Sequence, residues 1–285
     1  MSAQVGMGVD SLRGAAPVEQ AVASAASAPS ATAVLTRTGL TASEVTLGFG
    51  HKTVLSDVNL EFSQGITALI GPTGCGKSTF LRTLNRMNDK VRGFWHRGSI
   101  ELGDLDIYSG GADPLLVRKR VGMVFQRPNP FPMSIRDNVV AGVRAHRMAA
   151  RKEFPDIAES RLKQVGLWSA IADRMGDSPF RLSGGQQQLM CLARALAVDP
   201  EVLLLDEPTS SLDPVSTEMV EDLIKKLSSD LTIVIVTHNL AQARRIAHNT
   251  AFLYNGKLVE SGETSQVFEA PREPETASYV SGRIG

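Results

Sequence analysis

The stretch Gly71-Pro72-Thr73-Gly74-Cys75-Gly76-Lys77-Ser78, followed by Thr79, decides the fold of this chain. An apolar run of strand length, 66–70, precedes it, and residues 78–88 have the pattern of a helix. A strand, a glycine-rich turn and a helix are the context that a phosphate-binding loop requires. Glycines let successive backbone N–H groups face inward, and the first helical turn adds its own unpaired N–H groups. We therefore predict a nucleotide site in which Lys77 reaches the β- and γ-phosphates and the Ser78 hydroxyl binds Mg²⁺.

The composition is that of an ordinary globular protein. Of the 285 residues, 42% are hydrophobic and 21% are charged. Lys+Arg and Asp+Glu each number 30, so the net charge is zero and no basic excess indicates a nucleic-acid partner. The two cysteines, Cys75 and Cys191, make no disulfide framework, which favours a reducing cytosol. No apolar run approaches membrane-spanning length.

The chain divides into a tail and one domain. Residues 1–40 are rich in Ala, Ser, Thr and Gly and poor in large apolar groups, so we expect this tail to be disordered. The domain is expected over 41–285. Alternating or continuous apolar runs predict an α/β fold with a largely parallel sheet. Its expected strands are 43–47, 58–62, 66–70, 99–102, 121–125, 202–205, 231–236, 251–254 and 257–260.

The remaining patterns are helical. No strand pattern occurs between Ser134 and about Phe180, which predicts a helical subdomain, about 128–181, inserted in the core. Ser183 and Gln186 have the spacing of a capping box, and the helix that they open is expected to end near Val198. Asp213-Pro214 is a typical helix start. The buried face of that next helix is expected to carry Met219, Leu223 and Leu227.

Polar side chains follow four of the expected strands. Gln126 follows 121–125, Asp206 and Glu207 end the run from Val202, and Thr237-His238 follows 231–236. The phosphate-binding loop follows the remaining strand of this set, which is expected over 66–70. Because ligands of parallel sheets bind at the carboxyl ends of the strands, we expect these four features to converge on one site.

The two carboxylates have separate expected roles. Asp206 would hold Mg²⁺ through water opposite Ser78, and Glu207 would be the general base for the attacking water. The alternative is an acidic pair that caps the turn before Pro208. The presence of the phosphate-binding loop favours the catalytic interpretation.

Four other residues each allow two interpretations. Gln126 could sense Mg²⁺ or the attacking water, or be a polar strand end. His238 could bind the γ-phosphate, or be a turn histidine. Cys75 lies near Lys77 and a helix start, which favours thiolate, but a small packing residue is the simpler interpretation. Phe49 could stack on adenine, although spacing alone favours packing.

These motifs, taken in order, resemble the ATPases of ABC transporters. The resemblance runs from about residue 41 to the end and rests on Gly71–Ser78, Gln126, Leu182–Gln186, Val202–Glu207, Ser211–Asp213 and His238. It implies a P-loop NTPase core with a mostly parallel sheet, an antiparallel β subdomain and an inserted α-helical subdomain. It also implies ATP and Mg²⁺ as cofactors, with Ser78, Gln126 and Asp206 near the metal and with Glu207, His238, Gln126 and Lys77 as catalytic residues.

The resemblance further implies a partner. Two copies would pair head to tail with two ATP molecules between them, so that the phosphate-binding loop of one faces the Leu-Ser-Gly-Gly-Gln signature of the other. The nucleotide would then contact residues of both copies. Those implied residues are Phe49, as the adenine-stacking aromatic, Gly71 to Thr79, Ser183, Gly184, Gly185, Gln186 and, near the seam, Asp213.

A narrower resemblance is to the ATPase subunit of bacterial phosphate importers. It rests on Asn85–Asp89, Phe125–Ile135 and Tyr279–Gly285. It implies ATP-driven uptake of inorganic phosphate at the cytoplasmic face of the cell membrane, on two transmembrane permease subunits served by an external phosphate-binding protein. The proline-rich loop 127–132 would be a stiff link to a permease. Leu189 stands where the family commonly has Arg, which leaves the environment of the signature helix open.

Three competing functions follow from the same residues. One is an ABC importer for another solute, such as an amino acid or another oxyanion, because cargo never touches this chain. A soluble ABC ATPase of DNA repair or translation would usually carry a long coiled coil or two ATPase modules, and neither pattern occurs here. A nucleotide-binding regulator without turnover is disfavoured by Glu207 and His238.

Overall fold

The computed structural model describes residues 39–284, which lie within the compact unit Arg37–Gly285. The predicted disordered tail therefore falls almost entirely outside the described residues. Its last residue, Leu40, already begins the first strand, three residues before the predicted start at Ser43. Among residues 39–284, no helix combines the length and the apolar character that a membrane span needs.

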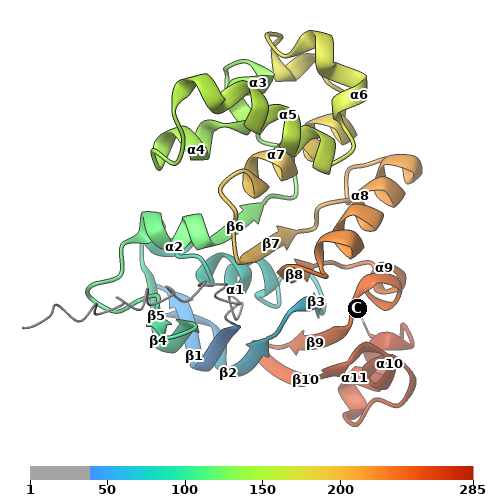
Figure 1. Ribbon diagram of the computed structural model, residues 1–285. Helices are drawn as coiled ribbons and strands as arrows, with labels where there is room; N and C mark the ends of the chain where they lie inside the picture. Colours follow the sequence, from blue (N-terminus) through green and yellow to red (C-terminus); the bar gives the residue numbers. More distant parts are fainter. Residues whose placement is uncertain (1–38, 285) are drawn as a thin grey trace, which may run out of the picture. The chain divides into compact units, whose positions relative to one another are not determined.

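The structure contains strands in two sheets and helices that cover them (Figure 1). The strands are β1 (Leu40–Phe49), β2 (Lys52–Phe62), β3 (Gly65–Ile70), β4 (Phe94–Leu102), β5 (Leu105–Asp106), β6 (Val121–Val124), β7 (Val202–Asp206), β8 (Thr232–Val236), β9 (Asn249–Tyr254) and β10 (Lys257–Glu263). The α-helices are α1 (Lys77–Thr83), α2 (Pro114–Arg120), α3 (Ile135–Val139), α4 (Ala141–Ala145), α5 (Phe154–Gln164), α6 (Trp168–Ile171), α7 (Gly184–Leu196), α8 (Pro214–Leu227), α9 (Leu240–Ile246), α10 (Thr264–Glu269) and α11 (Pro274–Val280). Short 3₁₀ turns are η1 (Met87–Lys90), η2 (Arg151–Glu153), η3 (Ala172–Arg174) and η4 (Pro179–Arg181).

The larger sheet has the order β10-β9-β3-β8-β7-β6. Neighbouring strands from β9 to β6 are parallel, and only β10 pairs antiparallel, through the hairpin at Asn255-Gly256. Every residue of β3, β7 and β8 is buried, which explains why these strands are continuous apolar runs. The predicted parallel sheet is therefore confirmed, and β3, β8, β7 and β6 all end at the same edge.

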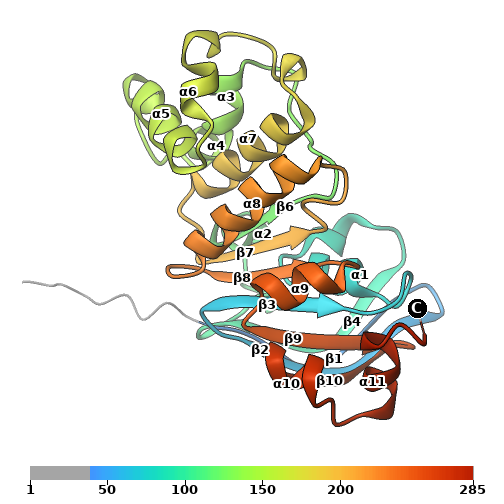
Figure 2. The ribbon, with the colours of Figure 1, turned by 90° about the vertical axis from the view of Figure 1, so that its right-hand side faces the viewer.

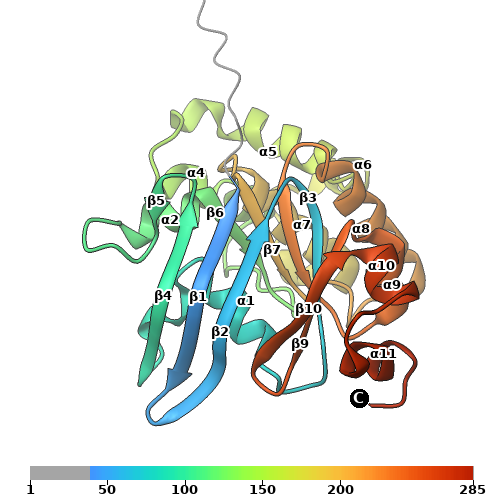
Figure 3. The same ribbon diagram turned by 90° about the horizontal axis from the view of Figure 1, so that it is seen from below.

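The smaller sheet has the order β2-β1-β4-β5 and is antiparallel (Figure 3). Its inner side chains, such as Leu47, Val58 and Phe62, form one apolar cluster with Phe80 of α1 and Leu204 of β7. The cluster places α1 between the two sheets. This confirms the predicted α/β fold with an antiparallel β subdomain.

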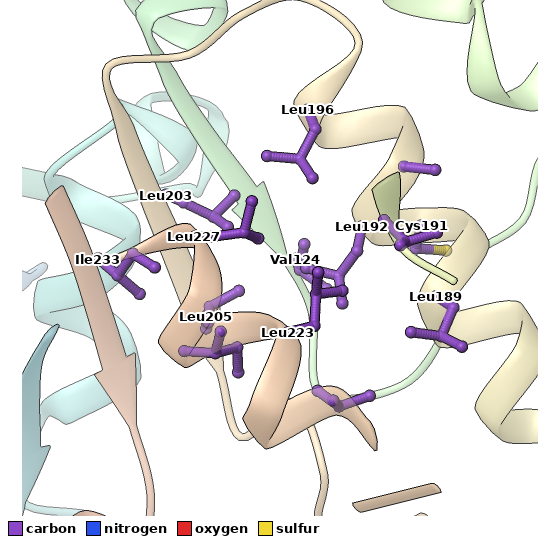
Figure 4. Close-up of a cluster of buried hydrophobic side chains, with 14 of the residues drawn as sticks. Val124, Leu189, Cys191, Leu192, Leu196, Leu203, Leu205, Leu223, Leu227 and Ile233 are labelled. Atoms are coloured by element: carbon purple, nitrogen blue, oxygen red, sulfur yellow. The ribbon is translucent and has the colours of Figure 1, made fainter. Parts of the chain in front are cut away.

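Residues between β6 and β7 form only helices and turns, and α3 to α6 gather away from both sheets (Figures 1 and 2). The helix α7 joins this group to the larger sheet, because its apolar face packs toward β7 and α8 (Figure 4). Leu189 belongs to that face and is 4% exposed. The position at which the family commonly has Arg is therefore part of an apolar core in this chain.

Two helix predictions were wrong in detail. The helix predicted over 78–88 ends at Thr83, because Arg86 adopts a left-handed backbone conformation at φ 63°. The Arg86 guanidinium then donates to the carbonyls of Ile107 and Ala112 at 3.0 and 2.8 Å. These long-range bonds favour a turn at Arg86 over continued helix.

The buried face of α8 contains the predicted Leu223 and Leu227 but not the predicted Met219. Met219 is 48% exposed, whereas Val220, Leu223, Ile224 and Leu227 are buried. The spacing 220, 223, 224 and 227 is the i, i+3, i+4, i+7 stripe of an amphipathic helix. Met219 lies next to this stripe and faces solvent.

Candidate functional site

The phosphate-binding loop, residues 71–78, connects β3 to α1 as predicted. Gly71, Gly74 and Gly76 have φ of 145°, 81° and 107°, a region that side chains other than glycine rarely adopt. A Cβ on Gly71 would also collide with the Leu253 carbonyl oxygen of β9. Glycine is therefore required at the first position both by conformation and by the neighbouring strand.

The Lys77 side chain lies inside this loop and is 7% exposed. Its Nζ donates to the carbonyl oxygens of Gly71 at 2.7 Å and Pro72 at 2.8 Å. Nζ also donates to Cys75 Sγ at 3.8 Å, a weak acceptor that an incoming anion would have to replace to receive the third proton. The loop holds its one cation where loop N–H groups and the start of α1 also favour negative charge.

A cavity of about 620 Å³ opens beside the loop. It is lined by Val54, Thr73, Gly74, Gly76, Lys77, Ser78, Thr79, Gln126, Glu207 and His238. Its lining thus contains residues that follow β3, β6, β7 and β8. The structure brings the four predicted strand-end features to one place, and the cavity is of the size that small-molecule ligands occupy.

Ser78 and Asp206 form the candidate magnesium site. The Ser78 hydroxyl donates to Oδ1 of Asp206 at 2.7 Å, and Arg82 Nη2 lies 3.0 Å from Oδ2. Asp206 is 2% exposed, so Arg82 compensates a buried negative charge. Hydroxyl and carboxylate oxygens are ligands that Mg²⁺ accepts, usually together with water and substrate phosphates. No cluster of three or more His, Cys, Asp and Glu suited to a metal ion occurs among residues 39–284.

The Glu207 carboxylate lies between two polar side chains. Its Oε2 accepts from Gln126 Nε2 at 3.1 Å and lies 2.9 Å from His238 Nδ1. Its backbone has φ 46°, an uncommon conformation for this residue, and its N–H donates to the Val236 carbonyl at 3.0 Å. Strained backbone is often found at functional sites. The carboxylate is oriented by three strands and can accept a proton from water at the cavity wall.

The predicted signature residues start α7. Ser183 Oγ accepts from the Gln186 N–H at 3.3 Å, and Gln186 Oε1 accepts from the Ser183 N–H at 3.1 Å. The capping box is therefore confirmed. Ser183 and Gly184 are exposed and do not line the cavity of their own chain.

Gly185 at the start of α7 and Asp213 at the start of α8 both lie against Ser216. Asp213 caps α8 by accepting from the Ser216 N–H at 3.0 Å and from Ser216 Oγ at 2.6 Å. These bonds hold the pKa of the Asp213 carboxyl below its usual value. A Cβ on Gly185 would overlap the Ser216 hydroxyl and lie 2.8 Å from the Ser216 Cβ. Glycine at 185 thus allows the two helix starts to approach.

Two functional candidates were not predicted from the sequence. One is Arg82, the partner of Asp206 described above, and the other is Gln188. Gln188 is fully buried, and its Nε2 donates to the carbonyls of Phe125 at 3.2 Å and Pro208 at 3.0 Å. One side chain of α7 therefore binds the backbone next to both Gln126 and Glu207. In the sequence, the one sign of a buried role for Gln188 is its position on the apolar face of its helix.

Phe49 and Cys75 lie at the margin of the site. Phe49 ends β1, is half-buried and packs on Phe94 with ring centroids 5.7 Å apart. It does not line the cavity, so its stacking on adenine stays a prediction. Burial raises the pKa of the Cys75 thiol, although Lys77 acts in the opposite direction. Because burial outweighs the nearby cation, the thiolate interpretation is disfavoured and the simpler interpretation of Cys75 as a small packing residue is favoured.

Comparison with known proteins identifies the family. The family profile described as "ABC transporter" matches residues 55–210, more than half of the chain. The chain belongs to the ABC transporter family. The matched range contains the phosphate-binding loop, Gln126, Ser183 to Gln186, Asp206 and Glu207, whereas Asp213 and His238 follow it.

Two relatives within the ABC transporter family have names that specify a cargo. The chain is 62% identical over 237 residues to "Phosphate import ATP-binding protein PstB" of Mycobacterium intracellulare, covering 83% of each chain. It is 60% identical over 247 residues to "Phosphate import ATP-binding protein PstB 2" of Mycobacterium tuberculosis (strain H37Rv), covering 86% of this chain and 89% of that one. The resemblance inferred from the motifs is confirmed.

A solved structure of the ABC transporter family has the same fold. A bacterial Atm1-family ABC exporter with ATP bound superposes with a TM-score of 0.72 at 24% identity. The match covers 88% of this chain and 43% of that longer chain. At this identity the likeness supports the fold alone.

Proposed function

We propose that this ABC transporter family member is a Mg²⁺-dependent ATPase that drives import of inorganic phosphate. The observation that carries the catalytic part is the position of Glu207, which Gln126 and His238 hold at the wall of the phosphate-loop cavity. The relatives named as phosphate import ATP-binding proteins support the cargo.

ATP binding is assigned to the loop and its flanks. The loop N–H groups and Lys77 would hold the β- and γ-phosphates, and Ser78 and Asp206 would hold the metal with Gln126 nearby. Bound Mg²⁺ supplies positive charge that neutralises the phosphate oxygens. Phe49, at the end of β1, would stack on the adenine.

Hydrolysis is assigned to Glu207 and its two neighbours. The Glu207 carboxylate would accept a proton from the attacking water, while Gln126 and His238 fix its orientation from either side. His238 Nδ1 is occupied by Glu207, which leaves Nε2 for the γ-phosphate. The strained backbone of Glu207 fits a residue positioned for chemistry.

A second copy would complete the site. Ser183 and Gly184 are exposed at the start of α7, whose N–H groups suit a phosphate, yet Ser183, Gly184 and Gly185 do not line the cavity of their own chain. We assign the head-to-tail dimer on this basis. Asp213, at the neighbouring start of α8, would lie near the seam.

The partners outside the dimer follow from the proposed transport. Two permease subunits would carry phosphate through the membrane, an external phosphate-binding protein would supply it, and this chain would act at the cytoplasmic face. The helices between β6 and β7 would form the subdomain that meets a permease. The stiff loop 127–132 connects Gln126 to these helices.

Phosphate uptake tests the cargo assignment. Cells that lack this gene and any duplicate should lose uptake at limiting phosphate, and the wild-type gene should restore it. A gene carrying Lys77→Ala should not restore uptake. Normal uptake in the deletion strain would exclude phosphate as the cargo, whereas loss of uptake of another solute would identify the replacement.

A further inference from the structure

The C-terminal segment lies against the phosphate-binding loop. Tyr279 of α11 is 6% exposed, and its ring stacks on Phe252 of β9 with centroids 4.8 Å apart and planes at 19°. In the folded chain, α11 lies beside the β9–β10 hairpin (Figure 2). Phe252 is the register partner of Ile70, which immediately precedes the loop. The stacked pair therefore reaches the first residue of the loop.

Tyr279 also meets the loop directly. Burial raises the pKa of the Tyr279 phenol, and hydrogen bonding by the Gly71 backbone opposes that rise. A cavity of about 420 Å³ is lined on one side by Gly71, Pro72 and Thr73 and on the other by Tyr279 and Arg283. The C-terminal segment therefore lines a space beside the loop.

Gly71 has little freedom between these neighbours. Its Cα faces the Leu253 carbonyl so closely that a Cβ could not be added, and Tyr279 lines the same small cavity as Gly71. The Gly71 and Pro72 carbonyls in turn accept the two shortest hydrogen bonds of Lys77 Nζ. A shift of this end of the loop would therefore move the cation that is expected to meet the phosphates.

The start of α11 has its own anchor. Glu260 of β10 is 6% exposed, and its Oε1 accepts from Gln266 Nε2 at 2.8 Å and the Arg272 N–H at 3.0 Å. Its Oε2 accepts from the Glu273 N–H at 3.2 Å, immediately before α11. Charged acceptors make strong hydrogen bonds. Glu260 thus fixes the helix that presents Tyr279.

We propose that Tyr279 is a positioning residue of the nucleotide site, which holds Gly71 and Pro72 and through them Lys77. The C-terminal segment resembles that of phosphate-import ATPases in sequence, and this contact gives it a role. The inference rests on the proposed ATP binding. It assigns to the nucleotide site a residue that does not line the cavity of about 620 Å³ and lies about seventy positions beyond Asp206.

The test compares ATP kinetics of purified full-length variants. Tyr279→Leu keeps apolar volume but removes the ring and hydroxyl, and we expect the KM for ATP to rise about tenfold with kcat changed less than about twofold, since misplaced groups weaken binding. Tyr279→Phe keeps the stacked ring and should raise KM by about two- to threefold, the loss of one weak hydrogen bond. Thermal unfolding of each variant shows whether it is folded. If Tyr279→Leu does not fold, the KM of Tyr279→Phe alone tests the proposal.

Val280→Ala is the matched control. Val280 is the neighbouring residue of α11, is half-buried and packs on the core rather than lining the cavity behind the loop. It should lower the melting temperature without changing KM. Unchanged KM in a folded Tyr279 variant, or an equal rise in Val280→Ala, would overturn the inference. If the wild-type protein itself binds no ATP, the proposed function fails instead.

Discussion

Nδ1 of His238 lies 2.9 Å from Oε2 of Glu207, although 31 positions separate the two residues in the chain. The contact joins the ends of the adjacent parallel strands β7 and β8. From the sequence alone, Glu207 could be a turn-capping acid and His238 a turn histidine. The contact shows that the two side chains lie together beside the phosphate-binding loop. Gln126 completes that arrangement from the end of β6.

Lys77→Ala should weaken ATP binding by about ten- to hundredfold, because each hydrogen bond to a charged group contributes about 1.5–3 kcal/mol. Titration of purified protein with ATP and Mg²⁺ measures the effect. Lys163→Ala is the control, since Lys163 is exposed and contacts only groups outside the cavity, namely Glu159 of the same helix and the Trp168 ring. Equal affinity in Lys77→Ala and wild type would remove Lys77 from the site.

Gly185→Ala should disrupt the junction of α7 and α8, because its Cβ overlaps the Ser216 side chain. Overpacking of this kind costs about 1–3 kcal/mol. We expect a lower melting temperature and reduced ATPase activity, with partial recovery in the double variant Gly185→Ala/Ser216→Gly. If Ser216→Gly does not relieve the defect, the close approach is not its cause.

Leu189→Arg should destabilise the protein, although Arg is the residue that the family commonly has there. Leu189 lies in the apolar cluster of α7, β7 and α8 (Figure 4). An uncompensated buried charge costs about 3–5 kcal/mol, whereas Leu189→Met should cost less than about 1.5 kcal/mol. Urea unfolding measures both. A Leu189→Arg protein as stable as wild type would show that this core admits a charge.

The stability that Glu260 provides should depend on pH. Burial pushes its pKa up, but hydrogen bonds from the Arg272 N–H, Gln266 and the Glu273 N–H outweigh burial and bring the pKa below its ordinary value of 4.5. A lowered pKa means that the stabilisation is complete above pH 4.5 and is lost as the pH falls through the folded-state value.

Glu260→Gln tests this dependence. The amide places N–H donors against backbone N–H groups, so we expect a lower melting temperature at pH 7 and a difference from wild type that shrinks below pH 4.5. Glu263→Gln, at an exposed position of β10, should show no such change. A difference that stays constant down to pH 3 would contradict the assignment.

Much of the fold and site was predictable because the deciding interactions are local. Glycine spacing marks the phosphate-binding loop, continuous apolar runs mark β3, β7 and β8, and Ser183 with Gln186 marks the start of α7. The convergence at the strand ends followed from a general property of parallel sheets. Those predictions needed no knowledge of contacts between distant residues.

The remainder depends on contacts between distant segments. The turn at Arg86 is fixed by carbonyls about twenty residues away, and Gln188 binds backbone that only the fold brings near. Cys75 has a raised thiol pKa because burial, invisible in the sequence, outweighs the adjacent lysine. The contact of Tyr279 with Gly71 spans most of the domain, so no local pattern could predict it.

Single-turnover release of phosphate from ATP by Glu207→Gln tests the proposed chemistry most directly. The amide keeps the shape of the side chain but cannot accept the proton, so release should slow by about 10²- to 10⁴-fold while ATP binding persists. The ATP-bound variant should accumulate as a dimer, and Glu218→Gln, at an exposed position of α8, should behave as wild type. A Glu207→Gln protein that releases phosphate at the wild-type rate would contradict the assignment of Glu207 as the base.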